Sequence, residues 1–192
     1  MDERALRTEL RRISIKTYDR GLIGGTGGNI SARLGDRYMF ITPSGLALCD
    51  STVENIVKVD LKSGEWTVPE PYIPSKEYRF HLAIYHVRPD VGAIVHCHAR
   101  FATAFAVRKM DIPYVTDAAF KQPPMPHVDF SPSGSEDLVD KVREVAEQYP
   151  NFRTILLNEH GIISVGRDLV QAYNFADLAE EMAQIALLSK LI

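Results

Sequence analysis

The segment Ile30-Ser-Ala-Arg-Leu-Gly-Asp-Arg-Tyr-Met-Phe-Ile-Thr42 predicts a β-hairpin, because two β-prone runs flank a tight turn at residues 34–37. A second hairpin follows, with a strand at residues 56–61, a turn at Ser63-Gly64 and a return strand at residues 65–67. Four short strands joined by tight turns are typical of an antiparallel sheet. We therefore expect a fold that differs from the doubly wound parallel folds.

Helical spacing of apolar residues and N-capping side chains predict the helices. They are expected at residues 2–20, 75–88, 100–109, 136–148 and 168–190. The second helix has Ser75 as its expected N-cap, and the fourth has Ser133 or Ser135. Buried strands are expected at residues 94–98 and 154–157, whereas residues 114–132 are rich in proline and carry no clear pattern.

Composition predicts an ordinary globular chain. Of its 192 residues, 45% are hydrophobic and 24% are charged, so we expect one domain over residues 1–192. The net charge of −3 predicts no binding to nucleic acid or to an acidic membrane surface. No apolar run reaches the length of a membrane span and the N-terminus is polar, which predicts a cytoplasmic protein. Two cysteines, Cys49 and Cys97, do not suggest a disulfide framework.

The segment Gly92-Ala-Ile-Val-His-Cys-His-Ala99 places two histidines at the end of a buried strand. Because side chains alternate along a strand, His96 and His98 should point to one face and Cys97 to the other. Two imidazoles on one face can form half of a metal site, but they can also be two hydrogen-bonded histidines. The segment alone leaves both interpretations open.

Two residues elsewhere favour the metal site. His160 follows the strand at residues 154–157, and Glu77 falls in the first turn of the helix that leads into the strand of His96. Three imidazoles and a carboxylate suit a divalent ion such as zinc, with a position open to a substrate. Three turns, around Asn29, Ser44-Gly45 and Ser75, offer hydroxyl and backbone N–H groups to an anion, and they could share the same edge of the sheet.

The chain resembles the class II aldolase/adducin family over about residues 5–190. Five motifs in register carry the resemblance: Gly27-Gly-Asn-Ile-Ser31, Thr42-Pro-Ser-Gly45, Pro74-Ser-Lys-Glu77 with Arg79-Phe-His81, His96-x-His98 and Glu159-His-Gly161. The resemblance implies a class II aldolase-like α/β fold of three layers (α-β-α) with a central, mainly antiparallel sheet. It also implies a C4 homotetramer with active sites between neighbouring subunits.

The resemblance implies the roles of the site residues as well. His96, His98, His160 and Glu77 correspond to the ligands of one divalent ion per subunit, which we expect to be zinc, although manganese, iron or cobalt fit similar ligands. Glu77 also corresponds to the acid/base of the aldolases, where the epimerases have an aspartate. The phosphate pocket corresponds to Gly28, Asn29, Ser44, Gly45 and Ser75.

The implied activity is that of a lyase that cleaves a small phosphorylated keto-sugar in a retro-aldol reaction, through an enediolate that the metal stabilises. Members of the family include L-fuculose-1-phosphate aldolase and L-ribulose-5-phosphate 4-epimerase. The alternatives are a decarboxylase of a 3-oxo acid, a phosphopentulose 4-epimerase and a non-enzymatic, adducin-like module.

Two departures from the family pattern bear on the choice among these activities. Lys76 stands where the aldolases usually have a second serine, and it could bind phosphate or a substrate carboxylate. The second departure concerns the acid for the departing aldehyde, because the fuculose aldolases use a tyrosine near residue 117 and another in a C-terminal tail. Here Asp117, Tyr114 and Lys121 are the candidates.

Overall fold

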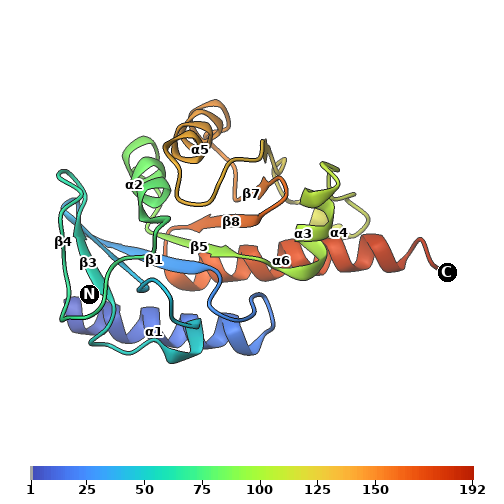
Figure 1. Cartoon of the computed structure of the whole chain (residues 1–192). Helices are drawn as coiled ribbons and strands as arrows, with labels where there is room; N and C mark the ends of the chain where they lie inside the picture. Colours follow the sequence, from blue (N-terminus) through green and yellow to red (C-terminus); the bar gives the residue numbers. More distant parts are fainter. Residues whose placement is uncertain (1) are drawn as a thin grey trace.

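A central mixed sheet organises the chain in this computed structural model, which describes residues 2–192 (Figure 1). Over these residues the sheet contains eight strands: β1 (Asn29–Leu34), β2 (Tyr38–Ile41), β3 (Val57–Asp60), β4 (Trp66–Thr67), β5 (Ala93–Cys97), β6 (His127–Val128), β7 (Thr154–Leu157) and β8 (Gly161–Gly166). Their order across the sheet is β4-β3-β2-β1-β5-β8-β7-β6. Both predicted hairpins are confirmed, because β1 pairs with β2 and β3 pairs with β4 in antiparallel register.

The other pairs of neighbouring strands are antiparallel too, except that β6 runs parallel to β7. In the middle of the sheet, Asn29 of β1 lies opposite His96 of β5, and Cys97 lies opposite Ile162 of β8. This register brings the start of β1, the end of β5 and the start of β8 to one end of the sheet. The candidate site lies at that end.

Helices cover both faces of the sheet. They are α1 (Glu3–Asp19), α2 (Tyr78–Val87), α3 (Arg100–Val107), α4 (Asp117–Phe120), α5 (Glu136–Gln148) and α6 (Leu169–Leu188). Helices α2 and α5 lie on one side, with α1 and α6 on the other (Figure 1). No helix within residues 2–192 combines the length and the apolar character that a membrane crossing requires.

Strand alternation sorts the apolar side chains into two cores, one on each face. Val95 and Cys97 of β5 pack in the core under α1, α3 and α6, whereas Ile94 packs in the core under α2 and α5. The core residues are almost fully buried, and each side chain of this size contributes about 1.5–3 kcal/mol when it leaves water. The two cores therefore hold β5 rigidly from both sides.

Four of the five predicted helices begin and end within two residues of the observed bounds. The helix expected at residues 75–88 instead begins at Tyr78, so Glu77 is its N-cap and does not lie in its first turn. The physical reason is a separate turn that precedes it. The N–H of Tyr78 donates to the carbonyl of Ser75 at 3.0 Å, and the N–H of Glu77 donates to the Ser75 hydroxyl at 3.4 Å.

Two strands have no counterpart among the predicted elements. Strand β6 lies in the proline-rich segment, and β8 starts directly after the turn Asn158-Glu159-His160 and forms a hairpin with β7. Glu159 in this turn has a φ of 60°, a left-handed conformation that is uncommon outside glycine. The turn therefore places His160 between β7 and β8.

Candidate metal centre and active site

The imidazoles of His96, His98 and His160 converge at the end of the sheet. One ligand nitrogen of each lies within 4.8 Å of the others, and their ring centroids are 4.8–5.2 Å apart. His96 is fully buried, and the other two are partly buried. The expected alternation is confirmed, because Cys97 packs in the core on the opposite face of β5.

The protonation of His96 can be assigned from its partners. Its Nδ1 lies 2.9 Å from the carbonyl oxygen of Ile162, and because a carbonyl only accepts, Nδ1 carries the proton. In a neutral imidazole Nε2 then presents a lone pair, and this atom lies 3.2 Å from Oε2 of Glu77. Two acceptors that face each other at this distance repel unless a cation lies between them.

The other two histidines support the same conclusion. Among residues 2–192, Nε2 of His96 and Nε2 of His98 are buried without a hydrogen-bond partner, and Nε2 of His160 lies 3.4 Å from the Glu77 carboxylate. An unsatisfied buried polar group costs about 1–3 kcal/mol, so two of them beside one carboxylate indicate a missing partner. Burial lowers the pKa of His98 and of His160 to about 4, which keeps both in the neutral form that binds metals. The residues present therefore fit a divalent ion.

Four neighbours surround the Glu77 carboxylate. Oε1 accepts a hydrogen bond from the hydroxyl of Ser133 at 2.6 Å, and it lies 3.4 Å from Nε2 of His160. Oε2 accepts from Nδ2 of Asn29 at 2.8 Å. Burial alone would raise the pKa of Glu77, whereas the Ser133 hydrogen bond and positive charge at the histidine cluster, such as a bound cation, lower it. With a cation held there, the group is an ionised, buried carboxylate.

A cavity of about 510 Å³ opens in front of these groups. Most of its lining residues belong to the sequence motifs, and Thr26 and Ser133 do not. The motif residues are Gly27, Gly28, Asn29, Pro43, Ser44, Gly45, Ser75, Lys76, Glu77, His98 and His160. His96 lies behind this surface. The three turns predicted to bind an anion therefore lie at one end of the sheet.

Backbone hydrogen bonds hold two of these turns together. The N–H of Ser44 donates to the carbonyl of Ile73 at 2.9 Å, and the N–H of Ser75 donates to the carbonyl of Thr42 at 3.2 Å. Both N–H groups are consequently used inside the protein. The hydroxyls of Ser44 and Ser75, with the exposed Lys76 beside them, are what these turns offer to an anion.

The three candidates for the second acid do not reach the cavity within one chain. Tyr114 donates its hydroxyl to the carbonyl of Pro123 at 2.6 Å, and Asp117 pairs with Lys121 on the surface. Lys121 lines a different cavity of about 650 Å³, which also includes Gly166 and Arg167 and so lies at the opposite end of β8. That larger cavity is remote from the histidines.

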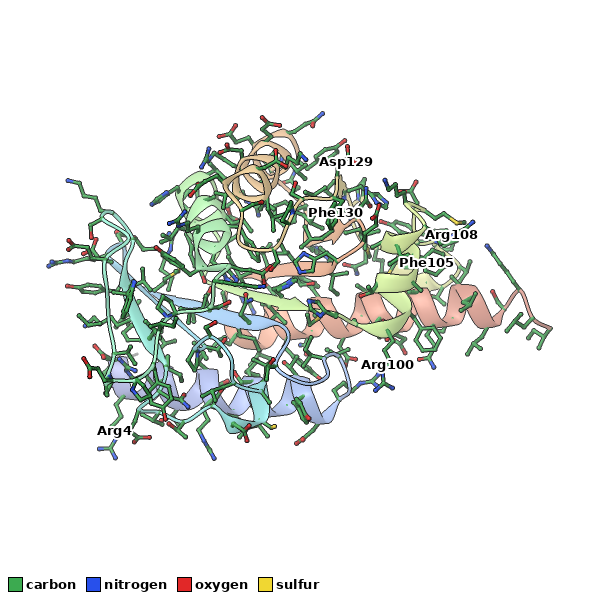
Figure 2. The ribbon with its side chains drawn as sticks, viewed as in Figure 1. Arg4, Arg100, Phe105, Arg108, Asp129 and Phe130 are labelled. Atoms are coloured by element: carbon green, nitrogen blue, oxygen red, sulfur yellow. The ribbon has the colours of Figure 1, made fainter. Side chains whose placement is uncertain are left out.

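Ser133 is the site residue that sequence reasoning places elsewhere. Its hydroxyl was an alternative N-cap for α5, but Ser135 fills that position by accepting from the N–H of Leu138 at 3.2 Å. Ser133 is left to contact Glu77. It belongs to the segment between β6 and α5 on which Asp129 and Phe130 are labelled, on the α5 side of the sheet (Figure 2). No residue spacing links this segment to Glu77.

Comparisons with known proteins agree on one family. The family model described as "Class II Aldolase and Adducin N-terminal domain" matches residues 8–187. The "L-fuculose phosphate aldolase" of Methanococcus maripaludis strain S2 is 35% identical over 179 residues, which cover 93% of this chain and 94% of that protein. The "3-oxo-tetronate 4-phosphate decarboxylase" of Pectobacterium atrosepticum is 34% identical over 95% of this chain and 84% of that protein. A solved structure named "L-fuculose 1-phosphate aldolase" is 29% identical with a TM-score of 0.87. The match covers 97% of this chain and 86% of that structure.

Proposed function

The chain belongs to the class II aldolase and adducin family, and we propose that it is a divalent-metal-dependent aldehyde-lyase that cleaves a small phosphorylated keto-sugar in a retro-aldol reaction. In this proposal, His96, His98 and His160 with Glu77 hold one divalent ion per subunit. Zinc is the preferred metal, and manganese, iron and cobalt are the alternatives. The observation that carries the proposal is the convergence of the three imidazoles on Glu77, with Nε2 of His96 3.2 Å from Oε2 of the carboxylate.

A bound divalent ion supplies a Lewis acid that polarises the substrate carbonyl group. In the cleavage direction the carbon–carbon bond breaks, the hydroxyl on the departing carbon loses its proton, and that carbon leaves as an aldehyde. The carbon next to the carbonyl group keeps the electron pair and needs a proton. In the synthetic direction the ionised Glu77 carboxylate removes the proton from this carbon. In the cleavage direction Glu77 first takes up a proton from solvent and passes it to this carbon, while the proton lost by the hydroxyl is released to solvent, so the protons balance.

The phosphate group holds the substrate in position away from the reacting carbons. We propose that it lies against the hydroxyls of Ser44 and Ser75, the amide of Asn29 and the backbone of Gly28 and Gly45, all of which line the cavity. Lys76 adds a positive charge at the same rim. A phosphate would thus meet several donors and one cation.

We further propose that residues 1–192 act as one domain and that four chains form a tetramer with active sites between subunits. Tyr114 and Asp117 can act in catalysis only if a neighbouring subunit brings them to the cavity. Several apolar side chains on the same stretch are at least 46% exposed, which favours a contact surface there: Val107, Met110, Val115 and Phe120.

The experiment is a metal analysis combined with a substrate panel. Protein expressed with zinc should contain one ion per chain, and His160→Ala should contain none. His86→Ala is the matched control, because Nε2 of His86 bonds the carbonyl of Leu61 away from the site. Wild-type protein without a bound divalent metal would overturn the proposal. Aldehyde release from ketose 1-phosphates is the expected activity.

A decarboxylase of a 3-oxo phospho-acid is the second candidate. Lys76 at the cavity rim favours it, because an ammonium group can bind a carboxylate, and one relative at 34% identity carries that name. Measuring carbon dioxide and aldehyde release over one panel separates the two activities. If Lys76 binds the substrate carboxylate, Lys76→Ala should raise KM for the 3-oxo acid far more than KM for the ketose phosphate. A 4-epimerase is less favoured because position 77 is glutamate.

A further inference from the structure

Behind Glu77, a row of buried polar side chains leads away from the cavity. Nδ2 of Asn29 contacts Glu77, and Oδ1 of Asn29 lies 2.5 Å from Nε2 of His81. Nδ1 of His81 lies 2.8 Å from the hydroxyl of Ser31, which lies 2.8 Å from the hydroxyl of Tyr85. All four side chains are at most 2% exposed. None of them except Asn29 lines the cavity.

The direction of every hydrogen bond in this row follows from its first member. Asn29 presents its NH₂ group to Glu77, because Nδ2 donates to Oε2 at 2.8 Å. Its carbonyl oxygen then faces His81, so Nε2 of His81 must carry the proton. Nδ1 is therefore an acceptor for the Ser31 hydroxyl, and Ser31 in turn accepts from the hydroxyl of Tyr85. Every donor points toward Glu77.

The surroundings of His81 agree with this assignment. The imidazole is fully buried, and burial lowers its pKa to about 3, so the ring is neutral and has one donor and one acceptor nitrogen. Phe80 stacks on it, with ring centroids 4.7 Å apart. The ring is held in place by this packing, and the tautomer is left to the hydrogen bonds.

We propose that His81 is a positioning residue that fixes the orientation of the Asn29 amide and, through it, of the Glu77 carboxylate. The proposal rests on the proposed function only in giving Glu77 a catalytic role. Without the Nε2 proton of His81, the amide could turn around and present its oxygen to the carboxylate. Glu77 would then lose a donor and gain a repulsive neighbour.

Ser31 acts one step further back in this row. Its hydroxyl occupies Nδ1 of His81 and so keeps the proton on Nε2. Removing that hydroxyl with Ser31→Ala allows the other tautomer, in which Nε2 accepts and the Asn29 amide turns. Tyr85→Phe removes only the outermost donor and should act in the same direction, but more weakly.

The first test reads the tautomer directly. Nitrogen-15 NMR of the histidine-labelled, zinc-loaded protein at pH 7 should show His81 neutral with its proton on Nε2. In Ser31→Ala, the signal should move toward the Nδ1-protonated form. A wild-type His81 with its proton on Nδ1, or a charged ring, overturns the proposal. The measurement needs no substrate, so it stands even if the assigned reaction is wrong.

The second test compares two buried serines in the same sheet. Ser31→Ala should lower kcat about tenfold and change KM less than twofold, with zinc content unchanged. Ser164→Ala is the matched control, because Ser164 pairs with Thr154 at 2.9 Å and is equally buried, but lies outside this row. It should lose stability without losing kcat. Equal kcat values for the two variants overturn the proposal, and Tyr85→Phe, with a loss of about twofold, repeats the test with a smaller structural change.

Discussion

The hydroxyl of Ser133 donates to Oε1 of Glu77 across 2.6 Å, although 56 residues separate the two positions. The other carboxylate oxygen accepts from Asn29, at the start of β1. Glu77 is therefore held from two directions, by the segment before α5 and by the central sheet. Its position as the N-cap of α2 leaves the side chain free to make both contacts.

Replacing Ser133 by alanine should slow the reaction without emptying the metal site. A hydrogen bond to a charged group contributes about 1.5–3 kcal/mol, and every 1.4 kcal/mol lost in the transition state is about a tenfold loss of rate. We expect kcat of Ser133→Ala to fall about tenfold or more. Steady-state kinetics and metal analysis of the same preparation check this result.

Ser135→Ala is the control for that variant, because it removes a serine hydroxyl only two positions away. Ser135 is the N-cap of α5, so its loss should lower the free energy of unfolding by about 1 kcal/mol. Its kcat should stay at the wild-type value. If Ser135→Ala slows the reaction as much as Ser133→Ala, the effect comes from α5 and not from the contact with Glu77.

Metal binding should stabilise the folded protein. A ligand that binds only the native state adds about 2.7 kcal/mol to the free energy of unfolding when its concentration is 100 times Kd. We expect a chelator to lower the thermal midpoint and added zinc to restore it. His160→Ala should show no such response, because it lacks one of the three clustered nitrogens. A His160→Ala variant that zinc stabilises as strongly as wild type would contradict the assignment of the site.

The fold was predictable where local signals decide it. Tight turns at residues 34–37 and Ser63-Gly64 specify the two hairpins, the apolar spacing specifies α1, and an N-cap serine specifies the start of α5. Strand β8 was not, because its pairing with β5 depends on tertiary contacts. A Cβ on Gly161 would lie 2.6 Å from the carbonyl of Cys97, so the glycine reflects a close strand approach that no local pattern reveals.

The histidine cluster was predictable because its residues lie in short motifs at strand ends, and the structure brings them together. Ser133 was not, because its contact with Glu77 depends on how the segment between β6 and α5 crosses the sheet end. For Tyr114 and Asp117, a single chain supports no role at the cavity. Within one chain they bond to Pro123 and Lys121, away from the cavity.

Glu180 on α6 should be one of the residues most important for stability. Its buried carboxylate accepts from the N–H groups of Phe101 and Ala102 at 2.9 Å, and so caps α3, whose own N-cap Ala99 has no side-chain hydrogen bond. Glu180→Ala should lower the free energy of unfolding by about 2 kcal/mol, as urea denaturation would show. The exposed neighbour Glu181 is the control, and Glu181→Ala should change stability by less than about 0.5 kcal/mol. Equal losses would mean that the cap contributes nothing.

Among the glycines of residues 24–28, which precede β1, Gly28 should tolerate substitution least. Gly25 and Gly28 both have left-handed backbones, with φ of 59° and 69°, so an alanine at either position carries a strain of about 1 kcal/mol. A Cβ on Gly25 meets nothing within 4 Å, but a Cβ on Gly28 would lie 2.8 Å from the carbonyl oxygen of His96. Gly28→Ala must therefore push β5 away from β1.

The two alanine variants separate strain from contact. Gly25→Ala should lose about 1 kcal/mol of stability in urea denaturation and bind zinc like wild type. Gly28→Ala should lose more, and its zinc affinity should fall as well, because the displaced backbone belongs to His96. If the two variants lose the same stability and keep the same affinity, the contact between Gly28 and the His96 carbonyl does not hold the metal-binding strand in place.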